Sequence, residues 1–239
     1  MPKFKIKLAD IIIDIDCIYD ACYKLCTDYL TDEGEADIHV NIDKQDIEYE
    51  RKISTDEENA KYSDAYLETL AVYRKIASET AKYGINLMHG AVIAKGNNAY
   101  MFTAPSGTGK TTHIKLWIKN IEGSYVINGD KPLLKIDDEF IKVYGTPWCG
   151  KENLCTNTSA LLKAVVILKR SKDNSIREIK PEDAAVSLIQ QTYRPYQKDA
   201  AYAVIKNIEK LSKNVRFFEL ECNMEDEAAL CSYNMLKGL

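Results

Sequence analysis

The stretch "TAPSGTGKTTH", Thr103 to His113, decides the fold of this chain. Its segment Ala104–Thr111 fits the phosphate-loop pattern G-x-x-x-x-G-K-[ST], with alanine in place of the first glycine. Gly107 and Gly109 permit backbone torsions that turn successive N–H groups toward phosphate oxygens. The pattern therefore predicts a nucleotide-binding loop, called the phosphate loop below.

The chain on either side of the phosphate loop has the character that such a loop needs. The strand-like run "AYMFTA" leads into it. The run "KTTHIKLWIKN" follows and places its apolar residues on one side of a predicted helix, with Trp117 expected in the core rather than stacked on a base. Since the N-terminus of a helix is positive, this order of strand, loop and helix favours binding of phosphate.

The side chains at the end of the loop supply the contacts to phosphate and metal. Lys110 can reach the β- and γ-phosphates of a nucleotide, and the Thr111 hydroxyl can ligate Mg²⁺. A guanine-nucleotide switch would carry an N-K-x-D segment downstream, and the chain has none. The predicted nucleotide-binding residues are Ser106, Gly107, Thr108, Gly109, Lys110, Thr111 and Thr112.

Strand-like and helical runs alternate over residues 84–239. "LMHGAVIAK", "SYVINGDKPLLKI", "FIKVYGTPW", "LLKAVVILKR" and "VRFFELEC" read as strands. Helices are expected from Pro181, over "QKDAAYAVIKNIEKLSK" and from about Glu225. We therefore predict an α/β (α+β) fold in which a mixed sheet is flanked by helices.

Residues 1–83 are expected to form a separate, small α+β unit. "FKIKLADIIIDI" predicts a strand pair or one long strand, "CIYDACYKLCTDYL" a short helix, and "ADIHVNI" and "DIEYERKI" two further strands. A long helix follows, with Ser54, Thr55 or Asp56 as its cap and Gly84 at its end. Its predicted apolar stripe is Tyr62, Tyr66, Leu70, Tyr73, Ala77 and Ala81.

The composition argues against several classes of partner and location. Among 239 residues 46% are hydrophobic and 28% charged, and the net charge is −4, so neither nucleic acid nor an anionic membrane is an expected partner. The chain has no run of about 18 uncharged apolar residues and no signal-peptide core at its start. Its seven cysteines are an odd number without a C-x-x-C pair, which favours a reducing cytoplasm over a disulfide framework or a zinc site.

Three neighbours of the phosphate loop are candidates for chemistry. His89 lies upstream, and Asp130 follows an apolar run at the place where a catalytic acid emerges from a sheet. The Gly/Pro-broken segment "YGTPWCGKEN" holds Lys151 and Glu152, and Arg194 lies between two predicted helices, where its guanidinium could grip a phosphate. Each also has a plain structural alternative: a buried strand histidine, a turn acid before proline, and solvated surface charges.

The motifs quoted above resemble a known family. "HGAVIA", "AYMFTAPSGTGKTTHIKLW", "VINGDKPLL" and "VYGTPWCGKEN" look like the HPr kinase/phosphorylase catalytic domain and its smaller relatives. PEP carboxykinase shares that P-loop fold more distantly. The resemblance covers roughly Leu87 to Asn153 with recognisable motifs and loosely the remainder of the chain, whereas residues 1–83 match none of them.

The resemblance implies a Mg²⁺-assisted phosphate site and a carboxylate base that takes the proton from an acceptor hydroxyl. By motif, Lys110 contacts phosphate, Thr111 and Asp130 hold the metal, Asp130 is also the acid, and His89 is its partner. HPr kinases carry two successive aspartates here, whereas this chain has Asn128-Gly129 before the single Asp130. Glu152 is the candidate for a second carboxylate, because "IDDEF" reads more simply as a hairpin turn. The E-x-R-G-x-G segment of the phosphorylase half is missing.

These observations lead to one expected function and two alternatives. We expect a kinase that uses ATP and Mg²⁺ and phosphorylates a hydroxyl, either a serine of a peptide or protein or a small-molecule alcohol. Residues 1–83 would recognise the acceptor or form contacts within a homo-oligomer. The alternatives are a nucleotide-binding regulatory module without phosphotransfer, which the single aspartate favours, and a PEP carboxykinase-like enzyme, which the short chain disfavours.

Overall fold

The computed structural model describes residues 2–53 and 62–239, which form two compact units, 1–80 and 81–239. The proposed cap residues Ser54, Thr55 and Asp56 lie outside the described residues. No helix within the described ranges combines the length and the apolar character that crossing a membrane requires.

The first unit is built on a three-stranded sheet in the order β1 (Lys3–Leu8), β2 (Ile11–Asp16), β3 (Ile38–Asn41). The first two strands pair antiparallel and the third joins β2 in parallel. Ala9 and Asp10 connect the hairpin with φ of 50° and 66°. Positive φ at both central residues matches the right-handed twist of the strands, so "FKIKLADIIIDI" forms the predicted strand pair.

Helices α1 (Asp20–Leu25), α2 (Lys44–Ile53) and α3 (Asp64–Thr80) complete this unit. The prediction of a strand over "DIEYERKI" is wrong, since this segment belongs to α2. Asp43 explains the difference, because its carboxylate accepts hydrogen bonds from the N–H groups of Gln45 and Asp46, while its own N–H donates to the Asp46 carboxylate. Such reciprocal capping starts a helix and overrides the strand-like alternation.

The predicted apolar stripe of the long helix α3 is confirmed only in part, since Ala77 is buried, as is Ala81 in the turn that follows, but Tyr66 is not. Its buried apolar residues include Leu67, Ala71 and Val72, whereas Tyr66 is 43% exposed. Tyrosine hydroxyls favour water, so the aliphatic set takes the core positions. Gly84 ends the segment as predicted, with φ of 75°, after a short 3₁₀ turn.

The second unit contains a nine-stranded mixed sheet with seven strands in the order β4-β8-β9-β10-β6-β5-β7. Strand β12 adds to β10 in parallel, and β11 pairs with β12. The strand predicted over "SYVINGDKPLLKI" is in fact two strands, β7 and β8, separated by a turn, and β11 was not predicted. The bounds are β4 (Ile85–Leu87), β5 (Ala91–Lys95), β6 (Asn98–Thr103), β7 (Ser124–Asn128), β8 (Leu133–Ile136), β9 (Ile141–Tyr144), β10 (Ser159–Arg170), β11 (Ser175–Ile179) and β12 (Arg216–Cys222).

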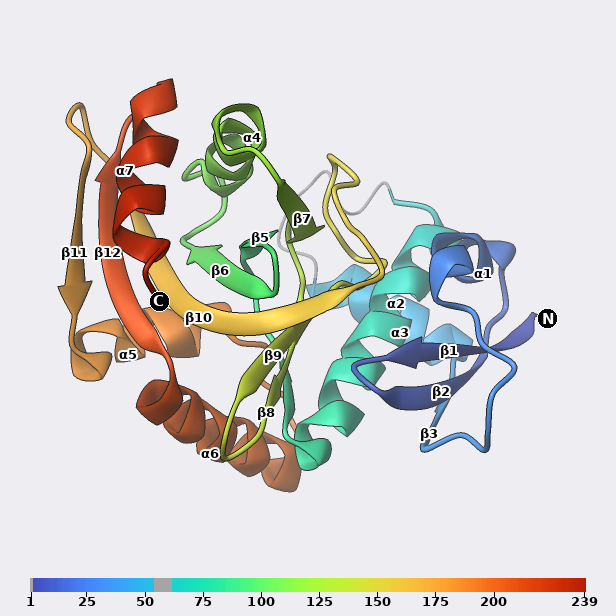
Figure 1. Ribbon diagram of the computed structural model, residues 1–239. Coiled ribbons are helices and arrows are strands. Elements are labelled where there is room, and N and C mark those ends of the chain that lie inside the picture. The colour runs from blue at the N-terminus through green and yellow to red at the C-terminus, as the bar shows by residue number, and fades with distance from the viewer. Residues whose placement is uncertain (1, 54–61) are drawn as a thin grey trace. The chain divides into compact units, whose positions relative to one another are not determined.

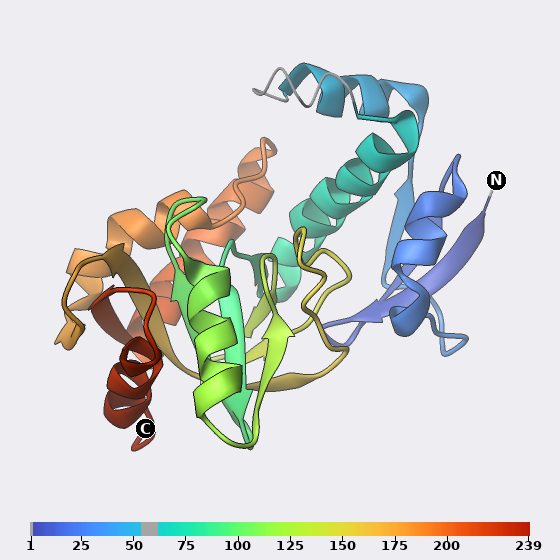
Figure 2. The same cartoon turned by 90° about the horizontal axis from the view of Figure 1, so that it is seen from above.

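Helices cover both faces of this sheet (Figure 1, Figure 2). On one face α4 (Lys110–Asn120) and α7 (Asp226–Leu236) pack on alternate residues of β6, Tyr100 and Phe102. On the other face α5 (Pro181–Gln191) and α6 (Lys198–Asn214) pack in the same cluster as Met101. This alternation is that of a strand buried on both sides, and the fully buried Trp117 confirms its predicted place in the core.

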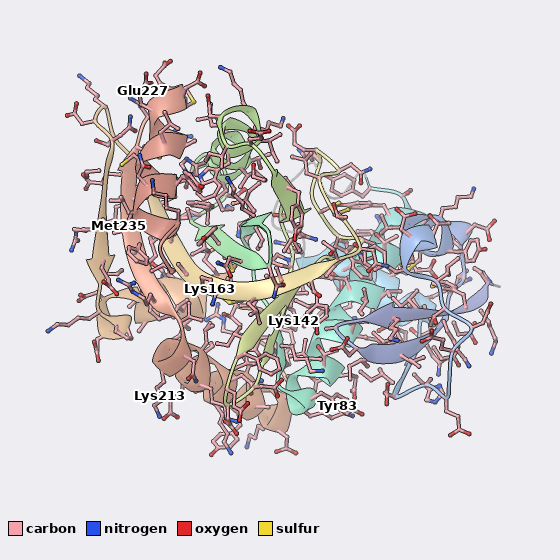
Figure 3. The ribbon with its side chains drawn as sticks, in the orientation of Figure 1. Tyr83, Lys142, Lys163, Lys213, Glu227 and Met235 are labelled. Atoms are coloured by element: carbon pink, nitrogen blue, oxygen red, sulfur yellow. The ribbon has the colours of Figure 1, made fainter. Side chains whose placement is uncertain are left out.

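Helix α7 has one exposed side and one side that is buried against the sheet. Glu227 and Met235 lie on its exposed side (Figure 3), whereas Ala228, Ala229 and Leu236 are buried against the sheet. The small alanines allow the helix to approach α4 and the strands closely. Because only three residues join β12 to α7, the N-terminus of α7 lies close to the end of β12, where a pocket described below is found.

Candidate active site

The phosphate loop leaves the end of β6 and enters α4 directly. Gly107 and Gly109 have φ of 76° and 123°, a region that residues with a side chain adopt only under strain. Gly109 is the N-cap of α4, and no side chain caps the helix. The amides of the first turn are therefore available to an anion, which fits a phosphate ligand.

Arg170 supports the loop from the neighbouring strand. Because β10 runs parallel to β6, with Ile167 opposite Thr103, the last residue of β10 lies beside the loop. The Arg170 guanidinium donates to the carbonyls of Thr108 (3.1 Å from Nε) and Gly107. With these two carbonyls held, the loop is shaped before any ligand binds. This role was not predicted, because it depends on which strand lies beside β6 in the sheet.

Lys110 is buried, with only 7% of its surface exposed. Its ammonium donates to the carbonyls of Ala104 (2.9 Å) and Pro105 (3.3 Å), so it lies folded against the loop. Burial lowers the pKa of Lys110 to about 8, an effect that the negative charge of Asp130 opposes and the positive charge of Lys131 reinforces. A polyanion in the loop would restore the charge on this amine.

The structure brings His89 and Asp130 together. His89 precedes β5 and Asp130 follows β7, two strands that pair with each other. The His89 Nε2 atom lies 3.2 Å from Asp130 Oδ1, and its Nδ1 lies 2.7 Å from Gln191 Oε1. The His89 ring is thus held between Asp130 on one side and Gln191 on the other.

The Asp130 carboxylate is tuned by opposing effects. Burial raises its pKa, but the hydrogen bond from His89 and the positive charges of Lys131, His89 and Lys110 outweigh it and leave the pKa below its usual value. Lys131 Nζ lies 3.8 Å from Asp130 Oδ2, and burial lowers the pKa of this lysine. The carboxylate is therefore ionised at neutral pH.

Backbone contacts fix the position of the His89–Asp130 pair. The side-chain oxygen of Asn128 accepts from the N–H groups of Asp130 (2.8 Å) and Lys131 (2.7 Å). The Asp130 carbonyl accepts from the N–H of Gly90 (2.9 Å), and the Thr103 hydroxyl donates to the His89 carbonyl (2.9 Å). Asn128, which stands near the place where the resembling family has another acid, therefore shapes the turn that presents Asp130.

The three remaining candidates lie at the surface. Glu152 is exposed and pairs with Lys115 of α4 at 2.6 Å. Lys151, next to it in the loop after β9, is also exposed, as is Arg194 in the segment between α5 and α6. The contacts described for these side chains do not include His89 or Asp130. These three side chains are therefore not part of the half-buried His89–Asp130 pair.

The oxygen ligands beside the phosphate loop are suited to a Mg²⁺ ion that bound phosphate would help to coordinate. Within residues 2–53 and 62–239 no cluster of three or more histidine, cysteine or acidic side chains could bind a metal ion by itself. Mg²⁺ is usually bound through one or two carboxylates together with substrate phosphates and water, so a protein cage is not required. The Thr111 hydroxyl and the Asp130 carboxylate are the residues that would hold it.

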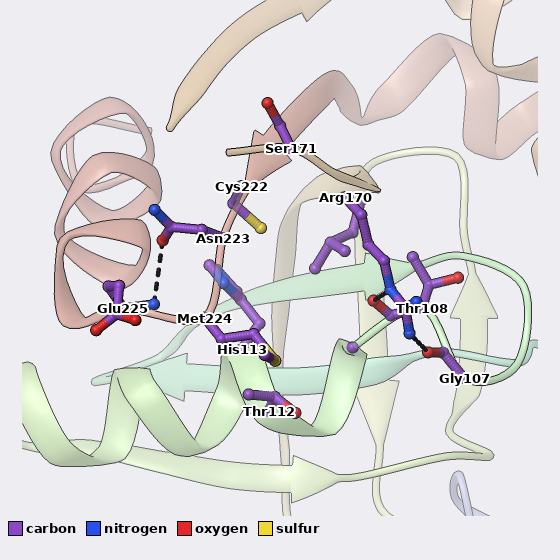
Figure 4. A pocket seen from close by; sticks show the side chains of 12 residues that line it. Gly107, Thr108, Thr112, His113, Arg170, Ser171, Cys222, Asn223, Met224 and Glu225 are labelled. Carbon is purple, nitrogen blue, oxygen red and sulfur yellow. Dashed lines mark hydrogen bonds between the residues drawn. The ribbon is translucent and has the colours of Figure 1, made fainter. Parts of the chain in front are cut away.

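A pocket of about 450 Å³ adjoins the other side of the phosphate loop (Figure 4). Its walls come from Gly107 to Gly109, the first turn of α4, and the ends of β10 and β12. His113 lies in this wall, 2% exposed, and burial lowers its pKa to about 4, so the ring is neutral at pH 7. The place of His113 in this wall was not predicted, because its position on the inner face of α4 is also that of an ordinary core residue.

No family model matches the chain, and no curated protein matches it in sequence. Among solved structures, the HPr(Ser) kinase/phosphatase from Coxiella burnetii is similar over 64% of this chain and 94% of that chain, with 8% identity and a TM-score of 0.38. A likeness at this level does not assign a function.

Proposed function

We propose that this chain is a phosphotransferase that uses ATP and Mg²⁺ to phosphorylate a hydroxyl group. The acceptor would be a small-molecule alcohol or a serine of a peptide or protein. One observation carries the proposal. An ionised carboxylate, Asp130, is hydrogen-bonded to His89 and acts electrostatically on the lysine of the phosphate loop, Lys110.

Each group has a distinct task in the proposed reaction. The loop amides and Lys110 hold the phosphates and neutralise charge on the transferred group. Asp130 accepts the proton of the acceptor hydroxyl, and His89 orients the carboxylate through its Nε2 hydrogen bond. Mg²⁺ held by Thr111 and Asp130 would add charge neutralisation at the phosphates. In this proposal Lys151, Glu152 and Arg194 border the acceptor, and residues 1–83 recognise it or form contacts between copies.

The proposal is tested by a search for phosphorylated products. Pools of hydroxyl metabolites and of serine-containing peptides are incubated with Mg·ATP, and products are detected by mass spectrometry. Wild-type protein should yield a product heavier by one phosphate. Lys110→Ala and Asp130→Asn should each lower the rate by about a hundredfold or more, because they remove phosphate stabilisation and the base respectively. Lys163→Ala, a strand residue outside the site, is the matched control.

A second function is favoured by one specific feature, the single carboxylate at the site. A regulatory module would bind ATP through the loop and transfer no phosphate. Tight binding of a non-hydrolysable ATP analogue, together with no phosphorylated product and no ADP release in any pool, would select this alternative. Unchanged turnover in both Lys110→Ala and Asp130→Asn would contradict the kinase proposal directly.

A further inference from the structure

Gln191, the last residue of α5, contacts the ring of His89 at the nitrogen that does not face Asp130. Its Oε1 atom lies 2.7 Å from His89 Nδ1, whereas Asp130 Oδ1 lies 3.2 Å from His89 Nε2. An imidazole has only these two polar atoms, so Gln191 and Asp130 together complete its hydrogen bonding. The proposed reaction gives a task to His89 and Asp130 but none to Gln191.

The backbone of Gln191 is joined to that of His89, so the side-chain contact has a fixed origin. Residues 87–89 and 191–193 run antiparallel and are connected by two backbone hydrogen bonds of 2.7 and 2.9 Å on either side of an isolated β-bridge. The shorter of these bonds runs from the His89 N–H to the Gln191 carbonyl. Both residues of the bridge are at most 4% exposed. Buried backbone hydrogen bonds of this kind hold the two segments in register.

The sequence ends α5 at the residue where this pairing requires it. Thr192, the C-cap residue, has extended backbone torsions (φ −93°, ψ 135°), and its N–H and hydroxyl both donate to the Leu188 carbonyl (3.0 and 2.7 Å). Pro195 follows closely, and a proline restricts the residue before it to extended conformations. The helix therefore stops at Gln191, and the chain continues as the extended segment that pairs with residues 87–89.

The orientation of His89 depends on its two hydrogen bonds, because packing leaves the ring partly open. Its side chain is 21% exposed, and that of Asp130 is 29% exposed. The χ2 torsion of histidine has broad energy wells, so rotamer preference does not fix the plane of the ring. Loss of the partner at Nδ1 would therefore free the ring to turn away from Asp130.

A glutamine is well suited to hold this nitrogen. Its amide presents an oxygen acceptor and an NH₂ donor on the same carbon, so it can pair with His89 Nδ1 whether or not this nitrogen carries the proton. A glutamate at the same place would add a negative charge near Asp130 and raise the pKa of that carboxyl group. An asparagine would end one carbon–carbon bond short of the ring. The length, polarity and neutrality of the Gln191 side chain thus agree with a role in holding His89.

We infer that Gln191 is a positioning residue for the proposed phosphoryl transfer. It holds the His89 ring so that Nε2 stays at Asp130 Oδ1, and it thereby fixes the carboxylate that takes the proton of the acceptor hydroxyl. Gln191 acts through His89 and takes no part in the proton transfer itself. The inference rests on the proposed function, because the role of Asp130 as the base belongs to that proposal.

Nuclear magnetic resonance tests the positioning without any substrate, since the chain has three histidines whose rings can be followed separately. Full-length protein with ¹⁵N-labelled histidine is measured at one pH, and the ring signals of His89 are identified as those absent from His89→Gln. The informative signal is that of Nε2, which faces Asp130 and not Gln191. Gln191→Leu should shift this signal, because the ring loses its fixed orientation, and should leave the signals of His39 and His113 in place.

Two further variants complete the comparison. Gln191→Asn keeps the amide but is too short to reach the ring, so it should shift the Nε2 signal as Gln191→Leu does. Gln190→Leu, the same substitution at the exposed neighbouring position of α5, is the matched control and should leave all ring signals unchanged. Thermal unfolding verifies that each variant is folded.

The contribution of Gln191 to the reaction is measured with an acceptor identified by the product search. Gln191→Leu should lower kcat about tenfold and leave KM for ATP within about twofold of wild type, because it disturbs the orientation of the base and leaves the phosphate loop intact. Gln190→Leu should keep the wild-type value of both constants.

The outcomes separate this inference from the proposed function. A His89 Nε2 signal that stays in place in both Gln191→Leu and Gln191→Asn would overturn the positioning role. A wild-type kcat in Gln191→Leu would overturn its contribution to the reaction and leave the kinase proposal standing. If wild-type protein gives no product in any pool, the proposed function fails, and the ring signals alone decide whether Gln191 positions His89.

Discussion

At the scale of single residues, the site is governed by a few charged groups, of which Lys110 is buried and Asp130 and Lys131 are half-buried. Lys110, Asp130 and Lys131 influence one another electrostatically, and His89 completes the group through its hydrogen bond to Asp130. The motif predicted Lys110 and Asp130 because their chemistry is tied to fixed positions after a strand. Lys131 and Gln191 were not predicted, since their roles depend on what lies opposite them in space.

The lowered pKa of Lys110 leads to a prediction on proton uptake. At pH 8.5 the free amine, with a pKa of about 8, is largely neutral. Bound phosphates raise this pKa, so binding of a non-hydrolysable ATP analogue should take up most of one proton per site, and markedly less at pH 7. Calorimetry in two buffers of different ionisation enthalpy measures the uptake. Lys110→Met should reduce it to the value of the ligand alone; an unchanged uptake in this variant would show that another group titrates.

Gly145 supports a second prediction at this scale. A Cβ atom there would lie 2.0 Å from the Thr156 carbonyl oxygen and 2.8 Å from that of Ile127, both of them backbone atoms. Gly145→Ala should therefore lower the free energy of unfolding by about 2 kcal/mol or more, because neither carbonyl can move without disturbing a strand end. Urea denaturation measures the change. Gly238→Ala, which meets no atom within 4 Å, should stay within about 0.5 kcal/mol of wild type.

At the scale of elements, local capping and strand order decide what the pattern leaves open. Segment α2 carries a strand-like alternation but forms a helix, because Asp43 and Asp46 cap its first turn. Strands β7 and β8 read as one run but are separated by the turn that Asn128 organises. That turn places Asp130 opposite His89. The error in the strand prediction and the origin of the site are thus the same feature.

The capping interaction of α2 can be measured by substitution. Asp43→Ala removes the acceptor of two backbone N–H groups and should lower the free energy of unfolding of the first unit by about 0.5–2 kcal/mol. Far-ultraviolet circular dichroism during urea denaturation follows the loss. Asp32→Ala, at an exposed loop position, is the control. Equal stability of the two variants would mean that the cap contributes nothing to α2.

At the scale of the whole molecule, the chain forms two compact units. The phosphate loop, the His89–Asp130 pair and the pocket all lie in residues 81–239. Their positions follow from one sheet, in which β6 lies between β10 and β5, and β5 pairs with β7. The loop is therefore flanked by Arg170 on one side and by the His89–Asp130 pair on the other.

This division predicts where a nucleotide will protect the chain. Amide hydrogen exchange is measured on the full-length protein with and without a Mg²⁺ complex of a non-hydrolysable ATP analogue. Protection should increase in the phosphate loop, the first turn of α4 and the turn after β7, because bound ligands stabilise the segments that they contact. Residues 2–53 should change little. Protection confined to this first unit would place the nucleotide site elsewhere, and Lys110→Ala should abolish the effect.

The sequence by itself determined the phosphate loop, the mixed sheet with its helices, and the identity of Lys110, His89 and Asp130 as candidates. These follow from local periodicity and from backbone torsions that only glycine adopts freely, both of which act over a few residues. The tertiary structure alone decided that Arg170 holds the loop, that Gln191 is the second partner of His89, and that Lys131 lies beside Asp130. Such contacts join residues many positions apart through the order and register of strands, which no local pattern encodes.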